Sequence, residues 1–371
     1  MIDLAAAEEV FEASVDGTVG LEEEFAILDP GTLDMVGRFE ELRDTAEPAL
    51  LERITGELIT SEIEIVSGRG EDLADAQARQ RDARRRLFAH ADARGAKLGS
   101  TGTHPWADYR EQGNIDTEHY RRVVEGLGYA ARRNNTFSLH VHVGVQGADR
   151  AVRTCDRLRP VLPLLLAVSA SSPFVDGRDT LLHSARSETF TRTFPRCGVP
   201  DAYGSWAAYR DYIDFLVRTN SIVEYTQVWW SVRPHFSFGT VEMRICDAQP
   251  TAQESDALAA FVVACVEQAA RDEADGAPFA DPPNRLVEEN LWRAIRHGMD
   301  GLQIDLATGE EIPARAVLER TAAWAGAELA FPERNGAQRQ RALLSEGASL
   351  HDVYASTVEE THRTYGHDTA A

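Results

Sequence analysis

Cysteine, lysine and long apolar runs are all scarce in this sequence of 371 residues. The four cysteines lie far apart and form no Cys-x-x-Cys pair, which predicts reduced thiols in a cytoplasmic protein and argues against a disulfide or zinc framework. No run of about 18 apolar residues is present, so no membrane span is expected. Residues 1–10 also lack the basic start and the apolar core of a signal peptide.

Positive charge is limited as well. Lys97 is the only lysine, and the formal net charge is −22. A nucleic-acid surface needs clustered basic residues, so this composition argues against a nucleic-acid partner. The chain is long enough for one large domain or two ordinary domains. Because it shows no internal repeat and no clear linker, we expect a single domain over residues 1–371, and a homo-oligomer is compatible with these features.

Segments with strand character carry most of the polar motifs, and helical segments follow in blocks. The expected strands are residues 18–29, 57–66, 96–103 and 136–145, and a hairpin of 227–235 and 240–246. The expected helices are 72–94, 116–133, 148–170 with a kink or restart at its prolines, 205–219, and most of the chain after 251. This order favours an α+β fold over a regular parallel α/β fold. Residues 173–200 are polar and rich in arginine, which predicts an irregular loop that covers a binding site.

The first expected strand has an acidic face and an apolar face. Side chains alternate along a strand, so Glu22 and Glu24 share one face, while Leu21 and Phe25 share the other face with Glu23. We expect Glu23 to be structural. The pair Glu22 and Glu24 fits a metal-binding platform, but it also fits a half-exposed strand with solvated glutamates.

The same spacing of polar residues returns on the later strands. The pairs are Glu62 with Glu64, His140 with His142, Arg233 with His235, and Glu242 with Arg244. If these strands join one sheet, one face is apolar and the other carries carboxylates, imidazoles and guanidinium groups. On a straight strand Glu57 would point away from Glu64, unless a bulge or a late strand start changes its direction.

A sheet face with several neighbouring carboxylates needs cations to offset their repulsion. Two carboxylates about 4 Å apart repel by roughly 4 kcal/mol at an effective dielectric constant near 20. Glutamate oxygens suit Mg²⁺ or Mn²⁺, neighbouring histidines shift the choice slightly toward Mn²⁺, and the absence of thiolates disfavours zinc. Arginines beside metal-binding carboxylates indicate a ligand with phosphate groups. No Walker-type Gly-rich loop is present, which agrees with phosphates held by metal ions on a sheet.

Five motifs follow one another along the chain. They are residues 20–25 (GLEEEF), 102–106 (GTHPW), 139–145 (LHVHVGV), 232–235 (VRPH) and 239–244 (GTVEMR). Each motif alone is weak, but the ordered set resembles the type 2 glutamate–cysteine ligase family, the YbdK-type carboxylate-amine ligases. The resemblance covers roughly residues 15–300. Residues 181–186 depart from the Gly-rich loop in which the family carries an arginine.

The resemblance implies a glutamine-synthetase-like catalytic fold, in which a curved and mainly antiparallel sheet binds ATP and Mg²⁺ or Mn²⁺ and helices pack on its convex side. By similarity the metal ligands would be Glu22, Glu24, Glu57, Glu64, His140 and Glu242. The catalytic arginines would be Arg244 and Arg186, and the nucleotide contacts would come from Arg244, Arg233 and His235. We expect substrate contacts from His142, His104 and Arg186.

The activity that this resemblance implies is an ATP-dependent carboxylate–amine ligation through an acyl phosphate, with release of ADP and phosphate. The small-molecule substrates would be an amino acid such as glutamate and an amine such as cysteine. Two alternatives stay open on the sequence. One is a metal-dependent hydrolase that activates water with the Glu and His residues, and the other is a non-catalytic ATP-binding protein that kept the ligase fold.

Overall fold

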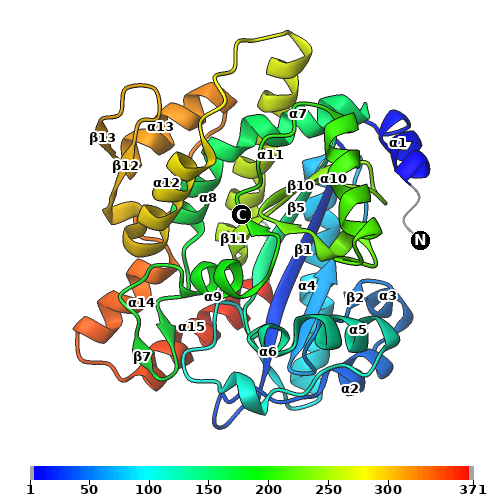
Figure 1. Cartoon of the computed structure of the whole chain (residues 1–371). Helices are drawn as coiled ribbons and strands as arrows, with labels where there is room; N and C mark the ends of the chain where they lie inside the picture. The colour runs from blue at the N-terminus through cyan, green and yellow to red at the C-terminus, as the bar shows by residue number, and fades with distance from the viewer. Residues whose placement is uncertain (1–3, 367–371) are drawn as a thin grey trace.

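A seven-stranded sheet with antiparallel pairing forms the centre of the computed structural model, which describes residues 4–366 (Figure 1). The strand order is β10-β11-β5-β1-β3-β2, and β4 pairs with the end of β1. The strands are β1 (Val19–Leu28), β2 (Ile54–Thr55), β3 (Glu62–Val66), β4 (Lys97–Gly99), β5 (Ser138–Gly144), β10 (Val232–His235) and β11 (Thr240–Asp247). The expected α+β class with a mainly antiparallel sheet is confirmed.

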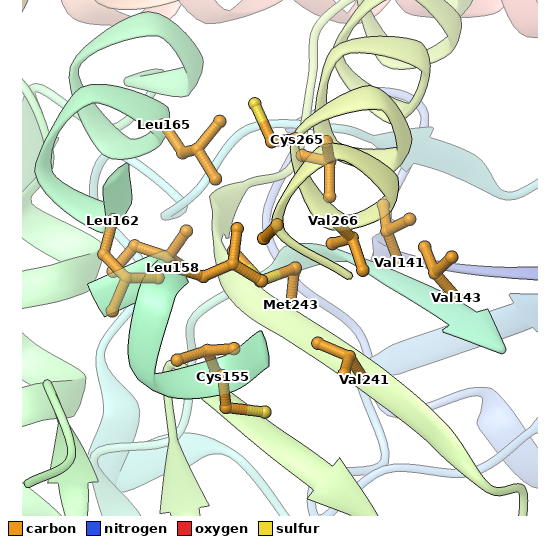
Figure 2. Packing of buried hydrophobic residues seen from close by; sticks show 14 of the residues in the cluster. Val141, Val143, Cys155, Leu158, Leu162, Leu165, Val241, Met243, Cys265 and Val266 are labelled. Atoms are coloured by element: carbon orange, nitrogen blue, oxygen red, sulfur yellow. The ribbon is translucent and has the colours of Figure 1, made fainter. Parts of the chain in front are cut away.

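Helices bury the apolar face of this sheet. They are α4 (Leu73–Ala93), α7 (Ala148–Leu158), α8 (Leu162–Ser169), α11 (Ala252–Ala274) and α15 (Leu350–Tyr365). Figure 2 shows Val141 of β5 and Met243 of β11 packed toward Leu158 of α7, Leu165 of α8 and Val266 of α11. Burial of each such side chain stabilises the fold by roughly 1.5–3 kcal/mol. This layer fixes which face of the sheet is left for polar groups.

Glu23 is the charged exception on the apolar face. Its carboxylate accepts two hydrogen bonds from Arg84 of α4, at 2.6 and 2.8 Å, and further bonds from Ser255 and Gln80. Both Glu23 and Arg84 are buried. A buried carboxylate is tolerable only with such partners. The expected structural role of Glu23 is confirmed.

A bulge in β11 changes the alternation of its side chains. Met243 pairs with Val141 of β5, but the next register pair joins Cys246 with Leu139, so β11 has one extra residue between the two pairs. Ile245 and Cys246 can therefore both be buried in the core. The bulge also moves Asp247 rather than residue 246 onto the polar side of the strand.

Several expected elements differ in detail. The strand expected over residues 57–66 is β3 and begins only at Glu62, so Glu57 lies in the segment before it. Gly128, with a φ of +56°, divides the helix expected over 116–133 into α5 (Glu118–Leu127) and α6 (Tyr129–Arg132). The restart expected within 148–170 is confirmed by the boundary between α7 and α8.

The expectation of an irregular segment over 173–200 is wrong in part. The helix α9 (Ala185–Thr193) forms within it because Ser184 caps the helix by accepting a hydrogen bond from the Ser187 backbone N–H. Three short strands flank this helix: β6 (Phe174–Val175), β7 (Arg178–Asp179) and β8 (Cys197–Gly198), the last pairing with β9 (Trp229–Trp230).

The other elements surround this centre (Figure 1). The N-terminal part adds α1 (Leu4–Glu12), α2 (Phe39–Asp44) and α3 (Pro48–Leu51), and the middle adds α10 (Trp206–Arg218). The C-terminal part adds α12 (Asn284–His297), α13 (Ala314–Ala325), α14 (Gly336–Ser345) and an unexpected hairpin of β12 (Leu302–Ile304) and β13 (Glu311–Pro313). No helix within residues 4–366 is long and apolar enough to cross a membrane.

Candidate active site

The strand register brings the polar pairs of the sequence into contact. Glu22 of β1 is the partner of His140 on β5, and Glu24 is the partner of Glu64 on β3. On the other side of β5, His142 is the partner of Glu242 on β11. Because side chains of directly opposed residues lie on the same face, the four strands build one continuous polar surface.

Three groups of candidate metal ligands follow one another on this surface, within the described residues. They are Glu22, His142 and Glu242; Glu22, Glu64 and His140; and Glu24, Glu57 and Glu64. In each group one ligand atom per residue lies within 4.8 Å of the others. The groups share Glu22 and Glu64, so they form one row. Glu57 joins this row because the chain before β3 is not part of the straight strand.

The carboxylates at the β3 end of the row repel one another. Burial, together with the charge of Glu24, raises the pKa of Glu57 to about 8. Burial and the neighbouring carboxylates also raise the pKa of Glu62 and Glu64 well above the usual range. Carboxyl groups that are buried and short of positive partners suit hard divalent cations with oxygen ligands. The residues present therefore fit Mg²⁺ or Mn²⁺.

The β11 end of the row carries more positive charge. Burial opposes ionisation of Glu242, but Arg233 and Arg244 outweigh it and hold the pKa of Glu242 well below its usual range. For Glu22, burial is likewise outweighed by His142 and His140, and its pKa is lowered well below the usual range. The site is therefore polarised, with excess carboxylate at one end and guanidinium groups at the other.

The two histidines of β5 present different atoms to the row. His140 has its Nδ1 atom 3.0 Å from Oε2 of Glu22 and its Nε2 atom 2.8 Å from the Ser138 hydroxyl. The Nδ1 atom of His142 lies 3.0 Å from the Thr240 hydroxyl, and its buried Nε2 atom has no hydrogen-bond partner although Glu22 lies 3.2 Å away. This geometry groups His142 with the candidate metal ligands. Of the two histidines, the sequence analysis assigned that role only to His140.

Arg244 and Arg233 both contact Glu242, but they differ in which side-chain N–H donors lack a protein acceptor. The Nη1 atom of Arg244 donates to Glu242 at 2.5 Å, while its Nε atom is buried without a hydrogen-bond partner. All three side-chain nitrogens of Arg233 donate to protein acceptors, which are Glu242 and the carbonyls of Thr226 and Val228. The structure therefore gives Arg233 the role of holding Glu242, and its expected nucleotide contact stays a prediction.

The nucleotide contact expected of His235 stays a prediction, whereas His104 differs from expectation. His235 stacks on Phe238 with ring centroids 4.3 Å apart, and burial lowers the pKa of His235 to about 3. His104 is buried away from the row, where Nε2 donates to the Leu33 carbonyl and Nδ1 accepts from two backbone N–H groups. With both ring nitrogens engaged, His104 has a structural role, and the expectation that it contacts substrate is wrong.

A cavity of about 190 Å³ adjoins the row at its β3 end. Its polar wall includes Glu24, Glu57 and Glu62 together with Arg186 and Arg244, and its apolar wall includes Tyr120, Phe190, Phe194 and Trp229. In the polar wall, Glu24, Glu62 and Arg244 come from the sheet, Glu57 from the segment before β3, and Arg186 from α9. The apolar residues come from α5, from α9 and the residue that follows it, and from β9. The cavity thus joins the candidate metal ligands to a pocket suited to organic substrates.

Arg186 reaches this cavity from the first turn of α9. Its Nη1 and Nη2 atoms each donate at 3.1 Å, to the carbonyls of Ile245 and Arg244, and Asp247 lies 3.6 Å away. Asp247 also accepts hydrogen bonds from the Ser172 and Ser184 hydroxyls. Asp247 therefore anchors both Arg186 and the start of α9.

Sequence reasoning missed two residues of this region, Asp247 and Ser138. It placed Glu62 on the polar face with Glu64 but gave it no site role. Ser138 donates to Glu24 and stands two residues before His140, so the alternation of β5 could have identified it. The bulge in β11 removes the corresponding signal for Asp247, because simple alternation points to residue 246.

Comparisons with known proteins identify the family of this chain. A model of the family described as glutamate-cysteine ligase family 2 matches residues 18–360. The chain is 40% identical over 365 residues to a protein of Rubrobacter xylanophilus assigned as glutamate–cysteine ligase 2-2, with 95% of this chain and 94% of that protein covered. It is 34% identical over 336 residues to the glutamate–cysteine ligase of Natronomonas pharaonis, with 89% and 92% covered.

Two solved structures share the fold. One is the glutamate–cysteine ligase of Francisella tularensis in complex with AMP, with a TM-score of 0.66, 12% identity, and coverage of 95% of this chain and 89% of that one. The other is the bifunctional glutathione synthetase of Pasteurella multocida, with a TM-score of 0.63, 14% identity, and coverage of 97% and 54%. The match over residues 18–360 and the identities of 34–40% confirm the sequence-based resemblance. The chain belongs to glutamate-cysteine ligase family 2, a family of ligases.

Proposed function

We propose that this protein is an ATP-dependent ligase that joins the carboxyl group of an amino acid such as glutamate to the amine of cysteine or a related compound. One observation carries the proposal: the three overlapping groups of candidate metal ligands lie beside an arginine-bearing cavity. The names of its relatives, and the AMP complex of a protein with the same fold, support the choice of nucleotide and substrates. We further propose that residues 1–371 act as a single catalytic domain.

A divalent cation held by the row would supply positive charge to neutralise the phosphate groups of ATP. The residues that would hold it are Glu22, Glu24, Glu57, Glu64, His140, His142 and Glu242. Ser138 supports this arrangement, since its backbone N–H and hydroxyl both donate to Glu24 and its hydroxyl contacts His140. Such contacts fix the rotamers of the ligands before a cation binds.

The reaction has two steps in this proposal. A carboxylate oxygen of the acid attacks the γ-phosphorus of ATP, the bond from that phosphorus to the bridging oxygen breaks, and ADP leaves. The amine nitrogen then attacks the acyl carbon, the C–N bond forms, the C–O bond to phosphate breaks, and the nitrogen loses a proton. The acid is thus activated without a covalent bond to the protein.

The chain contributes positioning and charge to both steps. Arg244 is held by Glu242 and directs an unpartnered Nε–H group into the buried region, where it can donate to a phosphate oxygen. Arg186 supplies a second cation on the cavity wall. The aromatic wall excludes water from the acyl phosphate until the amine arrives. These roles also favour a ligase over the hydrolase and the non-catalytic alternatives.

Formation of ADP tests the proposal. Purified protein with ATP, Mg²⁺, glutamate and cysteine should release ADP, and mass spectrometry should show a product in which the two amino acids are joined with loss of water. Replacing cysteine by other amines and glutamate by other acids ranks the substrates. ADP release that needs water alone would support a hydrolase, and ATP binding with no ADP release under any pairing would support a non-catalytic protein.

A further inference from the structure

A buried carboxyl group and a buried guanidinium group border the cavity and leave polar atoms unused. Glu62 of β3 is 1% exposed, and its Oε2 atom has no hydrogen-bond partner. Arg186 of α9 is 6% exposed, and its Nε atom has none. Both residues line the same cavity. Buried polar atoms without partners are rare and call for an explanation, which a bound ligand supplies.

Glu62 differs from the other carboxylates of the polar surface. Glu22, Glu24, Glu57 and Glu64 each belong to at least one group of candidate metal ligands, whereas Glu62 belongs to none of the groups found in residues 4–366. Its side chain lies on the same face of β3 as Glu64, two residues before it, and it lines the cavity. A metal site therefore does not account for Glu62.

Arg186 is fixed in place but is not neutralised by Glu62. Its two terminal nitrogens donate to backbone carbonyls, and its ion pair is with Asp247 rather than Glu62. The two residues thus present a buried carboxyl group and a buried guanidinium group to one space, which is the complement of a molecule that carries both an ammonium group and a carboxylate.

We propose that Glu62 and Arg186 form a subsite for the zwitterionic head of the α-amino acid that serves as the amine substrate. Glu62 receives the ammonium group, and Arg186 receives the carboxylate. This inference rests on the proposed ligase function and adds to it a residue, Glu62, that recognises the nitrogen. The cavity of about 190 Å³ is below the range of about 300–1,000 Å³ that holds drug-sized ligands, so it suits one amino acid.

The apolar wall of the cavity indicates the kind of side chain that the amino acid carries. Phe190 and Phe194 stack with ring centroids 4.5 Å apart, and Trp229 packs edge-on against Phe194 at 5.5 Å. All three line the cavity. Such an aromatic wall favours a small apolar or sulfur-bearing side chain over a second carboxylate. The subsite therefore fits the amine substrate better than glutamate.

Calorimetric titration of the Mg²⁺-loaded protein with three probes tests the subsite. The probes are L-cysteine, 3-mercaptopropionate, which lacks the ammonium group, and cysteamine, which lacks the carboxylate. The wild-type protein should bind cysteine more tightly than either truncated probe. Glu62→Gln should weaken cysteine binding roughly 10- to 100-fold, which is the effect of losing a hydrogen bond to a charged group, and leave 3-mercaptopropionate unchanged. Arg186→Gln should weaken cysteine in the same way and leave cysteamine unchanged.

Three controls keep the test specific. Glu254→Gln removes another buried carboxylate, one that pairs with Arg339 away from the cavity, and should leave cysteine affinity unchanged. Thermal unfolding of each variant checks that it is folded. Titration with Mn²⁺ should give Glu62→Gln the affinity of the wild type, whereas loss of Mn²⁺ binding would make Glu62 a metal ligand and overturn the subsite.

Other outcomes also overturn the proposal. They are equal weakening of cysteine and 3-mercaptopropionate by Glu62→Gln, or a wild-type protein that does not prefer cysteine to its truncated forms. A parallel series with glutamate, glutarate and 4-aminobutyrate would move the subsite to the acid substrate if that series alone responds to Glu62→Gln. A wild-type protein that binds cysteine as expected but releases no ADP would refute the ligase and keep the subsite. Ligase activity with an unchanged KM for cysteine in Glu62→Gln would refute the subsite and keep the ligase.

Discussion

Glu22 and His140 are 118 residues apart in the sequence, yet Oε2 of Glu22 lies 3.0 Å from Nδ1 of His140. The contact exists because β1 and β5 pair antiparallel in a register that opposes these two residues. The same register places Gly20 opposite His142, where a Cβ atom on Gly20 would lie 3.5 Å from Cβ of His142. One strand pairing thus joins two separate motifs into the centre of the proposed metal site.

Glu24→Gln should abolish turnover and leave the protein folded. The substitution keeps the shape and one acceptor oxygen for Ser138 but removes the charge from the group formed by Glu24, Glu57 and Glu64. We expect ADP formation to fall about 100-fold or more, because metal stabilisation of charge is worth several kcal/mol and about 1.4 kcal/mol is tenfold in rate. Wild-type rates in this variant, or in excess EDTA, would refute the metal assignment.

Glu23→Gln should show the opposite pattern. The adjacent Glu24 lines the cavity, but Glu23 faces α4 and pairs with Arg84. Breaking this pair leaves a buried guanidinium group without its main partner and should cost about 3–5 kcal/mol of unfolding free energy in urea titrations. The KM for ATP should stay the same, since Glu23 does not line the cavity. Unchanged stability would contradict the role of this pair.

Arg244→Lys should impair the reaction severely although the charge is kept. A lysine can pair with Glu242, but a single ammonium group cannot also offer a second donor in a fixed direction, as the free Nε–H of arginine does. We expect kcat/KM for ATP to fall by roughly 10²–10³, similar to the loss of one oxyanion donor. Kinetics equal to the wild type would assign Arg244 only to the support of Glu242.

Protonation of His104 should destabilise the fold in mildly acidic solution. Burial lowers the pKa of His104 to about 4, although the Leu33 carbonyl and Asp34 act in the opposite direction. The Nδ1 atom of His104 also accepts hydrogen bonds from two backbone N–H groups. The native state thus binds the proton less readily than the unfolded chain, whose pKa is near 6.5, so this stability is complete above about pH 6.5 and is lost as the pH falls toward about 4.

The matched variant for this prediction is His104→Gln, which cannot titrate. Urea unfolding at about pH 7 and about pH 5 should show that the wild type loses about 2 kcal/mol more than the variant over this interval. Comparison with the variant is needed because burial also lowers the pKa of His183 and His362 to about 4. An equal loss in both proteins would show that His104 does not titrate as expected.

Asp247→Asn should loosen the segment 173–200, whose role as a cover of the active site stays a prediction. The buried carboxylate accepts hydrogen bonds from Ser172 and Ser184 and lies beside Arg186. The NH₂ group of an asparagine would face one of these donor groups and could not accept its hydrogen bond. Limited proteolysis within this segment should be faster than in the wild type. In the wild type, cleavage should slow when ATP, metal and glutamate are all present. An unchanged cleavage rate in both tests would leave the segment without a covering role.

Alternation along single strands was enough to find most of the polar surface. Glu22 with Glu24, and His140 with His142, stand at the spacing that places two side chains on one face, and this depends on local geometry alone. The apolar residues between them likewise predicted the buried face. Ser138 belongs to the same alternation. Helix ends were also local, as the Ser184 cap of α9 shows in a segment that the sequence analysis took to be irregular.

The position of each strand in the sheet was decided by tertiary structure. Alternation cannot reveal that Glu242 lies beside His142 or that Glu24 faces Glu64, because register depends on pairing between segments far apart in the chain. The role of His104 was equally hidden. Its motif matches the family, but the backbone groups of residues 33, 106 and 107 occupy both ring nitrogens. A sequence shows which donors and acceptors exist, whereas only folding decides which of them are already paired and which are left free for a ligand.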